Sequence, residues 1–371
     1  MDISSEMIYP LVPLFLATIL GTTKTTIGII EGVAESTASI LKVFSGYLSD
    51  KLGRRKLLMG LGYGVSVLSR PIMGLSVSWS QVLAARFIDR LGKGIRTAPR
   101  DAIIADSVET NNLGKAFGFH RAMDTVGAVI GPAIAFFLLL IFSNNFRLIF
   151  WLSMIPGLIA VALIIFFITE KRKSRDELAK LPKLTIKDFD GNFRHYMIVI
   201  ALFSIGNTSD AFLILRAENL GVDKEYIPVV YLLFNLVYSM SSMPLGILAD
   251  KIGFRKTIIL SFILYAAVYL GFGLADSAYH VLFLFCIYGV FKGMSEGTQR
   301  AYLATLSPPE RKATAFGIYH MVVGFALLPA SIIGGFLWDR IGPHATFFYG
   351  ALTGILSAVL FIVLIRNRRQ H

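Results

Sequence analysis

The stretch GYLSDKLGRRKLL, residues 46–58, returns in almost the same form as GILADKIGFRKTI, residues 246–258. Each copy places a carboxylate and several bases between long apolar runs, in a chain of 371 residues of which 55% are hydrophobic. At an offset of 200, the two copies share the residues Gly46, Leu48, Asp50, Lys51, Gly53, Arg55 and Lys56. This repeat predicts two related halves within one chain.

The apolar runs are long enough to cross a bilayer. The runs at residues 148–168 and 347–365 approach the ~20 residues that a helix rising ~1.5 Å per residue needs to cross a ~30 Å hydrocarbon layer. Only 16% of the residues are charged and the mean hydropathy is +0.65, which is unlike a soluble protein. The chain opens MDISSEMIYP, acidic and then apolar, so we expect no cleaved signal peptide.

The hydropathy pattern predicts an all-α integral membrane protein with twelve transmembrane helices in two pseudo-symmetric six-helix bundles. The predicted spans are residues 2–21, 27–49, 57–77, 79–105, 113–140, 147–168, 195–219, 226–249, 256–275, 278–305, 312–337 and 344–366. A polar linker at residues 170–194 separates the bundle at 1–169 from the bundle at 195–371. Two halves in one orientation are typical of secondary transporters, whose substrate path lies between the repeats.

The net charge of +12 comes from bases in the short gaps between spans. The gaps on one side carry most of the loop Lys and Arg, so the positive-inside rule predicts cytoplasmic N- and C-termini. We therefore expect a multi-pass protein of the inner or plasma membrane, whose partner is the lipid bilayer and not nucleic acid. The single cysteine, Cys286, lies in an apolar run and excludes an intramolecular disulfide.

Across its whole length the sequence resembles the major facilitator superfamily. The signature of that family after span 2, G-x-L-[SA]-D-[KR]-x-G-R-[RK], reads here as residues 46–55, and the second copy departs from it at Phe254. The resemblance implies a monomeric transporter of a small-molecule substrate that works by alternating access. It also implies a cytoplasmic gate that favours the outward-facing state, formed by Gly46, Asp50, Gly53, Arg54, Arg55, Gly246, Asp250, Gly253 and Arg255.

Asp50 lies near the C-terminal end of span 2, where the helix dipole disfavours an anion. A partner that holds this carboxylate in one conformation and releases it in another would make it a gate contact. Alternatively, each copy forms a tight turn whose bases set the orientation of the chain. The two interpretations are compatible.

Span 4 carries an unusual charged face. Its residues Arg86, Arg90, Lys93, Thr97 and Arg100 recur at helical spacing. A charge left in lipid costs ~2.5 to 3.5 kcal/mol on insertion scales, so this face is expected to contact protein or water. Residues 90–94 also resemble the fourth-span signature R-x-x-x-G of the superfamily, which implies proton coupling for Arg90.

Span 5 resembles the signature G-x-x-x-G-P-x-x-G-G of proton-driven exporters through Gly127, Gly131 and Pro132. Ala135 and Phe136 replace its final glycines, so the match is partial. The alternative is a kinked helix that packs closely, because small residues let helices approach one another.

Ionisable residues within the spans predict a path for protons and substrate. Glu31, Glu35 and Lys42 share one stripe of span 2, whereas their equivalents at offset 200 are only polar. Because buried carboxylates can bind and release protons near neutral pH, we expect proton handling mainly in the first half. The predicted path comprises Asp2, Glu6, Glu31, Glu35, Arg86, Asp89, Arg90, Lys93, Arg96, Arg121, Asp124, Asp210, Asn235, Lys292 and Glu296. A purely structural network of ion pairs is the alternative.

Bases and acids nearly balance in the first-half spans, which favours internal pairing over a dedicated anion pocket. The histidines show no metal-ligand spacing and no P-loop is present, so we expect neither an enzyme nor an ATP-driven pump. The expected energy source is a proton gradient, with no cofactor and no metal.

Span 1 is shorter than its repeat. Leu20-Gly21 aligns with Leu220-Gly221, so the start of span 7 near His195 corresponds to a position before residue 1. We expect that the native chain starts upstream or that this one is trimmed.

The sequence therefore predicts a secondary active transporter that exports a small organic solute by proton antiport. A uniporter or symporter of an organic anion or nutrient is the alternative within the class. A non-transporting receptor or scaffold on the same fold is less compatible with so many costly intramembrane charges.

Overall fold

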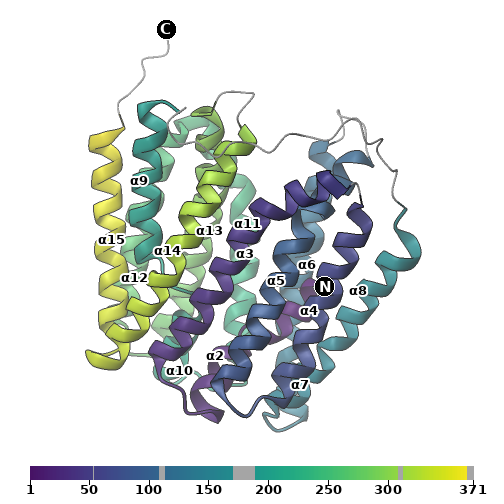
Figure 1. Cartoon of the computed structure of the whole chain (residues 1–371). Helices are drawn as coiled ribbons and strands as arrows, with labels where there is room; N and C mark the ends of the chain where they lie inside the picture. The colour runs from purple at the N-terminus through teal and green to yellow at the C-terminus, as the bar shows by residue number, and fades with distance from the viewer. Residues whose placement is uncertain (53, 108–112, 170–188, 308–311, 366–371) are drawn as a thin grey trace. The chain divides into compact units, whose positions relative to one another are not determined.

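The computed structural model describes residues 1–52, 54–107, 113–169, 189–307 and 312–365, and this part of the chain is helical without strands (Figure 1). Side chains are not described for the helical residues next to some of the gaps, namely 46–52, 105–106, 113–118, 121–122 and 312–313. The predicted all-α architecture is confirmed.

The first six spans are built from eight helices and one π-helical turn. Span 1 consists of α1 (Asp2–Ile8), α2 (Leu11–Leu14) and η1 (Phe15–Ile19). Spans 2 to 5 are α3 (Lys24–Leu52), α4 (Arg55–Leu75), α5 (Trp79–Asp106) and α6 (Leu113–Ile141), and span 6 is formed by α7 (Phe146–Leu152) and α8 (Met154–Phe167).

The second six spans follow the same plan. Span 7 consists of α9 (Gly191–Gly206) and α10 (Ala211–Asn219). Spans 8 to 12 are α11 (Ile227–Ile252), α12 (Phe254–Leu274), α13 (Ala278–Thr305), α14 (Lys312–Arg340) and α15 (Pro343–Leu364). The predicted number of twelve spans is therefore confirmed.

Helix ends deviate by a few residues from the hydropathy prediction. Helix α9 begins at Gly191, inside the predicted linker, because Asp190 caps it: its carboxylate accepts a hydrogen bond from the Phe193 amide at 2.8 Å. By length and composition alone, nine segments within the described ranges can cross a membrane. Helices α3, α4 and α5 are not among them, since they carry the charged residues of the candidate site in unit 1.

By contacts, the chain divides into two compact units. Unit 1 comprises Met1–Thr22, Val33–Leu181 and Asp223–Leu232, and unit 2 comprises Thr23–Gly32, Pro182–Val222 and Leu233–His371. The units resemble the predicted halves except that Thr23–Gly32 and Asp223–Leu232 are exchanged, and these two segments are equivalent at offset 200. The boundaries predicted from sequence stay a prediction.

Within unit 1, small residues bring helices close. A side chain at Gly92 would collide with the Gly62 carbonyl, so α4 and α5 approach backbone to backbone. Within unit 2, α12 packs against α13 and α15 through aromatic rings, among them Tyr265, Phe291 and Phe361. Large apolar side chains such as Phe166 and Phe283 are exposed, as expected of a surface that faces lipid.

Candidate functional site

Both units contain an interrupted first span at the same position of the repeat. Span 1 is broken at Tyr9 and Pro10, and span 7 is unwound over 207–210, whereas continuous helices were predicted at both places. At offset 200, residues 9 and 10 correspond to 209 and 210. Pro10 lacks an amide donor, and Asn207, Ser209 and Asp210 compete with the helix for backbone hydrogen bonds. Interrupted spans at corresponding positions of two repeats indicate a binding site.

In unit 1 the break lies beside the charged face of α5. The guanidinium carbons of Arg86 and Arg90 lie 5.6 and 6.0 Å from the centre of the Tyr9 ring. Both distances permit a cation–π attraction. The Tyr9 ring contacts the Tyr231 ring in a tilted arrangement, with 5.3 Å between the ring centres. The break in span 1 thus presents an aromatic ring to two buried arginines.

Four residues form what we call the first charge cluster: Glu35, Arg70, Asp89 and Arg90. Arg90 Nη2 lies 2.7 Å from Glu35 Oε1, and Arg90 Nη1 lies 3.9 Å from Asp89 Oδ2. Arg70 Nη2 lies 3.3 Å from the other Asp89 oxygen, Oδ1. Arg70, Asp89 and Arg90 are buried, while the Glu35 side chain is 31% exposed. Pairing offsets the desolvation of these charges, and Glu35 is the most exposed member of the cluster.

Serine hydroxyls hold the arginines of this region in place. Arg70 donates to Ser5 Oγ at 3.0 Å and to Ser4 Oγ at 3.3 Å, which ties α4 to α1. Arg96 donates to Ser66 Oγ and lies over the Tyr63 ring at 4.6 Å. Lys93 lies on α5 between Arg90 and Arg96 and is partly exposed.

The predicted packing residues of span 5 lie against α1. A side chain at Gly127 would approach Asp2 Cβ to 2.8 Å, and one at Gly131 would approach Glu6 Cβ to the same distance. Pro132 lies within α6 directly after Gly131. These glycines therefore allow α1 to lie directly on α6, and Glu6 Oε2 is buried there without a hydrogen-bond partner among the described residues. On α6, Asp124 pairs with His120 at 3.4 Å.

Unit 2 contains the second charge cluster, formed by Asp210, Tyr288 and Lys292. Asp210 lies in the unwound segment of span 7, and its Oδ1 accepts a hydrogen bond from Tyr288 OH at 2.5 Å. Lys292 Nζ lies 3.5 Å from the same oxygen and 5.3 Å from the centre of the Tyr288 ring. The break in span 7 thus holds a carboxylate between a phenol and an ammonium.

The remaining predicted path residues of unit 2 are not members of this trio. Glu296 accepts from Tyr238 OH at 2.9 Å and pairs with Arg300 at 3.5 Å. Asn235 on α11 is buried, and so is Glu31, which belongs to the part of α3 in unit 2.

The predicted gate residues are only partly described. Arg55 donates to the Ala102 carbonyl near the end of α5, and Arg255 donates to the Ile362 carbonyl near the end of α15, both at 3.4 Å. The equivalent arginines therefore interact with the negative ends of neighbouring helices. Gly253 has φ +92°, a backbone conformation that glycine adopts more readily than other residues. This conformation supports the tight-turn interpretation of the second copy.

The other predicted gate residues are at least partly exposed or are not fully described. Arg54, Gly246 and Asp250 are at least partly exposed. Gly53 and the side chains of Asp50 and Arg121 lie outside the described residues, and for Gly46 only the helical backbone is described.

Sequence reasoning missed several residues of the site. Arg70 is not among the predicted path residues, although a charge within an apolar span is a signal for a functional residue. Tyr9, Tyr238 and Tyr288 carry no such signal, because a tyrosine within a span is ordinarily an apolar packing residue. Within the described ranges, no three His, Cys, Asp or Glu side chains gather as a metal site would require.

The comparisons with known proteins agree on one family. The family model described as Major Facilitator Superfamily matches twice, over residues 1–215 and 196–371. An uncharacterized MFS-type transporter of Methanocaldococcus jannaschii is 37% identical over 98% of this chain and 92% of its own length.

More distant relatives have more specific names. Multidrug resistance protein MdtL of Escherichia coli is 25% identical over 87% of this chain and 81% of its own length. A probable 4-methylmuconolactone transporter of Cupriavidus pinatubonensis is 25% identical over 94% of this chain and 83% of its own length. Among solved structures, a POT family transporter in complex with 5-aminolevulinic acid has a TM-score of 0.81 at 14% identity, covering 98% of this chain and 93% of its own. At this low sequence identity, the structural similarity shows only that the two chains share a fold.

Proposed function

Because this chain belongs to the major facilitator superfamily and is therefore a membrane transporter, we propose that it exports a small organic solute across the cell membrane in exchange for protons. The termini are cytoplasmic in this proposal, as the distribution of loop bases indicates. The similarity to a multidrug resistance protein supports export.

The observation that carries the proposal is the ion pair between Glu35 and Arg90 at 2.7 Å. When Glu35 binds a proton it loses its charge, so its attraction for Arg90 falls. Arg90 has a second acceptor within the first charge cluster, because Asp89 Oδ2 lies 3.9 Å from its other nitrogen. Proton binding at Glu35 would thus move the guanidinium toward Asp89, and a ligand that favours one of these arrangements shifts the population toward it.

Arg70 keeps Asp89 available for this exchange. It holds the other oxygen of Asp89 at 3.3 Å and is itself fixed by Ser4 and Ser5. Asp89 is thereby held where it can accept Arg90, while Glu35, at 31% exposure, is the more exposed of the two carboxylates. One arginine with two carboxylates of unequal exposure can couple proton binding to side-chain movement.

The test is proton flux in proteoliposomes under an imposed pH gradient, with organic cations, organic anions and sugars as candidate solutes. Glu35→Gln removes the proton acceptor but keeps the shape of the side chain, so we expect substrate-dependent proton movement to fall to background while solute exchange without a gradient continues. Arg90→Ala is expected to lose both activities. Asp276→Asn, at a loop carboxylate that is 81% exposed, is the matched control and should retain both. Solute transport without proton movement in the unmodified protein would contradict antiport.

A second candidate is uptake or facilitated passage of an organic anion. Arg86, Arg90, Lys93 and Arg96 all lie on α5, and the similarity to a probable 4-methylmuconolactone transporter points the same way. In the same assay, this function predicts that anions move together with protons or without them, and that Arg86→Gln weakens solute binding more than Glu35→Gln does.

A further inference from the structure

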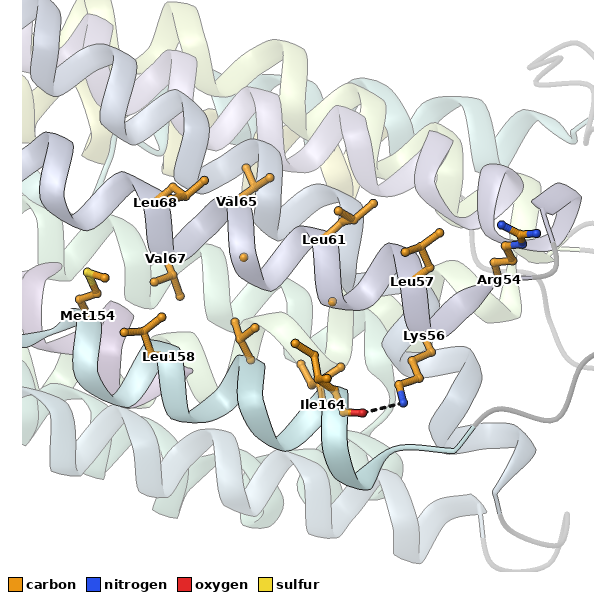
Figure 2. Close-up of a pocket in the computed structure, with 14 residues that line it drawn as sticks. Arg54, Lys56, Leu57, Leu61, Val65, Val67, Leu68, Met154, Leu158 and Ile164 are labelled. Atoms are coloured by element: carbon orange, nitrogen blue, oxygen red, sulfur yellow. Dashed lines mark hydrogen bonds between the residues drawn. The ribbon is translucent and has the colours of Figure 1, made fainter.

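A groove runs along the outer surface of unit 1 between α4 and α8 (Figure 2). Its volume is about 880 Å³, and apolar side chains dominate its walls, among them Leu57, Leu61 and Leu68 from α4 and Leu158 from α8. These four leucines are each about half exposed. The groove lies apart from the first charge cluster, none of whose members lines it.

One end of the groove is basic. Arg54 and Lys56 lie at the start of α4, where the bases of the repeated loop predict the cytoplasmic surface. Lys56 Nζ donates a hydrogen bond to the Ile165 carbonyl at 2.9 Å, drawn as the dashed line in Figure 2. This hydrogen bond holds the ammonium group at the basic end of the groove. Arg54 is exposed beside it. Two cations at the membrane surface attract an anionic headgroup.

Two glycines keep the groove open. Gly60 and Gly64 lie one turn apart on α4; a side-chain carbon at Gly64 would have no neighbour within 4 Å, and one at Gly60 would meet only Ile164 at 3.9 Å. At offset 200 their equivalents are Leu260 and Leu264. The second half thus carries large side chains where the first half carries none.

The dimensions of the groove suit one hydrocarbon chain. From Arg54 to Leu68, α4 rises by about 21 Å at ~1.5 Å per residue. One leaflet of the hydrocarbon core is ~15 Å thick, so a chain that starts at the basic end can extend along the groove through its own leaflet.

We propose that this groove binds one anionic phospholipid of the surrounding bilayer, with its phosphate at Arg54 and Lys56 and one hydrocarbon chain over Gly60 and Gly64. The basic end supplies selectivity for the headgroup, and the glycines supply room for the chain. The site is separate from the charge clusters and does not depend on the transported solute.

Native mass spectrometry of the full chain, titrated with phosphatidylglycerol or phosphatidylcholine of identical acyl chains, tests the proposal. We expect the anionic lipid to bind more tightly. Arg54→Gln and Lys56→Gln should each weaken the binding of phosphatidylglycerol about fivefold, since the attraction of one base to an anionic membrane surface contributes ~1 kcal/mol. Neither variant should change the affinity for phosphatidylcholine. Gly64→Leu introduces the residue found at the equivalent position 264 and should weaken the binding of both lipids, because the leucine side chain fills the groove.

Lys256→Gln is the matched control, because Lys256 occupies the position of Lys56 in the second half. It should retain full binding of phosphatidylglycerol. Gly60→Leu provides a second groove-filling variant if Gly64→Leu lowers the melting temperature. Equal affinity for the two lipids, an equal loss in Lys256→Gln, or unchanged binding in both glycine variants would overturn the proposal. Dimers that Gly64→Leu abolishes would overturn it as well, because they would assign the groove to a second copy of the chain.

Discussion

Arg70 shows how a single buried charge is held within unit 1. Its side chain has no exposed surface and contacts the Asp89 carboxylate and the hydroxyls of Ser4, Ser5 and Ser69. A buried ion pair adds little net stability, but removing one partner leaves the other charge uncompensated. The main contribution of Arg70 to stability is therefore to compensate the buried charge of Asp89.

We predict that Arg70→Met destabilises the protein by about 3–5 kcal/mol, because it removes the nearer of the two cations beside the buried Asp89, at 3.3 Å against 3.9 Å for Arg90. The double variant Arg70→Met with Asp89→Asn should recover most of this loss. Thermal unfolding in detergent measures both, and Arg194→Met, at an exposed arginine of α9, should stay within about 0.5 kcal/mol of the unmodified protein. A double variant as unstable as the single one would show that the two residues do not act as a pair.

A second residue-scale feature lies in the loops outside the spans. The Asn144 side chain donates a hydrogen bond to the Glu225 carboxylate, and this bond lowers the pKa of Glu225 below its ordinary value. A carboxyl group with a lowered pKa in the folded state contributes stability that is fully present above its unfolded pKa of ~4.3. That contribution disappears as the pH falls through the lowered value.

Asn144→Gly is the suitable variant, because Asn144 has φ +62° and glycine accepts that conformation. We predict that it lowers the melting temperature at pH 7, and that the difference from the unmodified protein vanishes below about pH 4, as Glu225 becomes protonated. Ser143→Gly, at the neighbouring residue with φ +48°, controls for the backbone effect and should show no such pH dependence. A difference that is constant with pH would argue against the Glu225 contact.

At the scale of elements, the beginning of α3 is joined to the end of α14 within unit 2. The Asp339 carboxylate accepts hydrogen bonds from the Lys24 amide at 3.0 Å, the Thr25 amide at 2.7 Å and the Thr25 hydroxyl at 2.6 Å, so it caps α3 from another helix. A side chain at Gly28 would collide with the Ser331 carbonyl. The contact therefore requires both an acceptor and a small residue.

We predict that a cross-link between Thr25→Cys and Asp339→Cys, in a Cys286→Ala background, forms readily and arrests transport until it is reduced. Alternating access requires helices of a transporter to separate and rejoin, and a covalent bond prevents separation at this contact. Solute flux in proteoliposomes before and after reduction measures the effect, and each single cysteine variant serves as a control. Full transport by the cross-linked protein would show that this contact persists throughout the cycle.

At the scale of the whole molecule, the sequence repeat has structural counterparts. Gly21 and Gly221 both have positive φ, the first spans of both halves are interrupted, and a charge cluster lies at each interruption. The clusters nonetheless differ, since the first contains two arginines and two carboxylates, whereas the second contains one lysine, one carboxylate and a tyrosine. A duplicated scaffold therefore carries unequal chemistry in its two units.

Much of the fold could be predicted, because hydropathy and helix length are local properties of a sequence. The predicted spans match helices such as α5 and α13 to within one residue, since an apolar stretch in lipid has to satisfy its backbone hydrogen bonds internally. The breaks in spans 1 and 7 were not predicted. Asn207, Ser209 and Asp210 are tolerated within a helix, and only their surroundings decided that this one unwinds.

The twelve spans, the repeat and the residues that could carry charge into the membrane all follow from composition and spacing along the chain. The pairing of those charges follows from the packing of the helices: Arg90 contacts Glu35, Arg70 contacts Asp89, and Tyr288 and Lys292 contact Asp210. Partners in an ion pair are chosen by how helices distant in sequence pack. That packing depends on close approaches such as Gly62 against Gly92, which spacing along one helix does not encode.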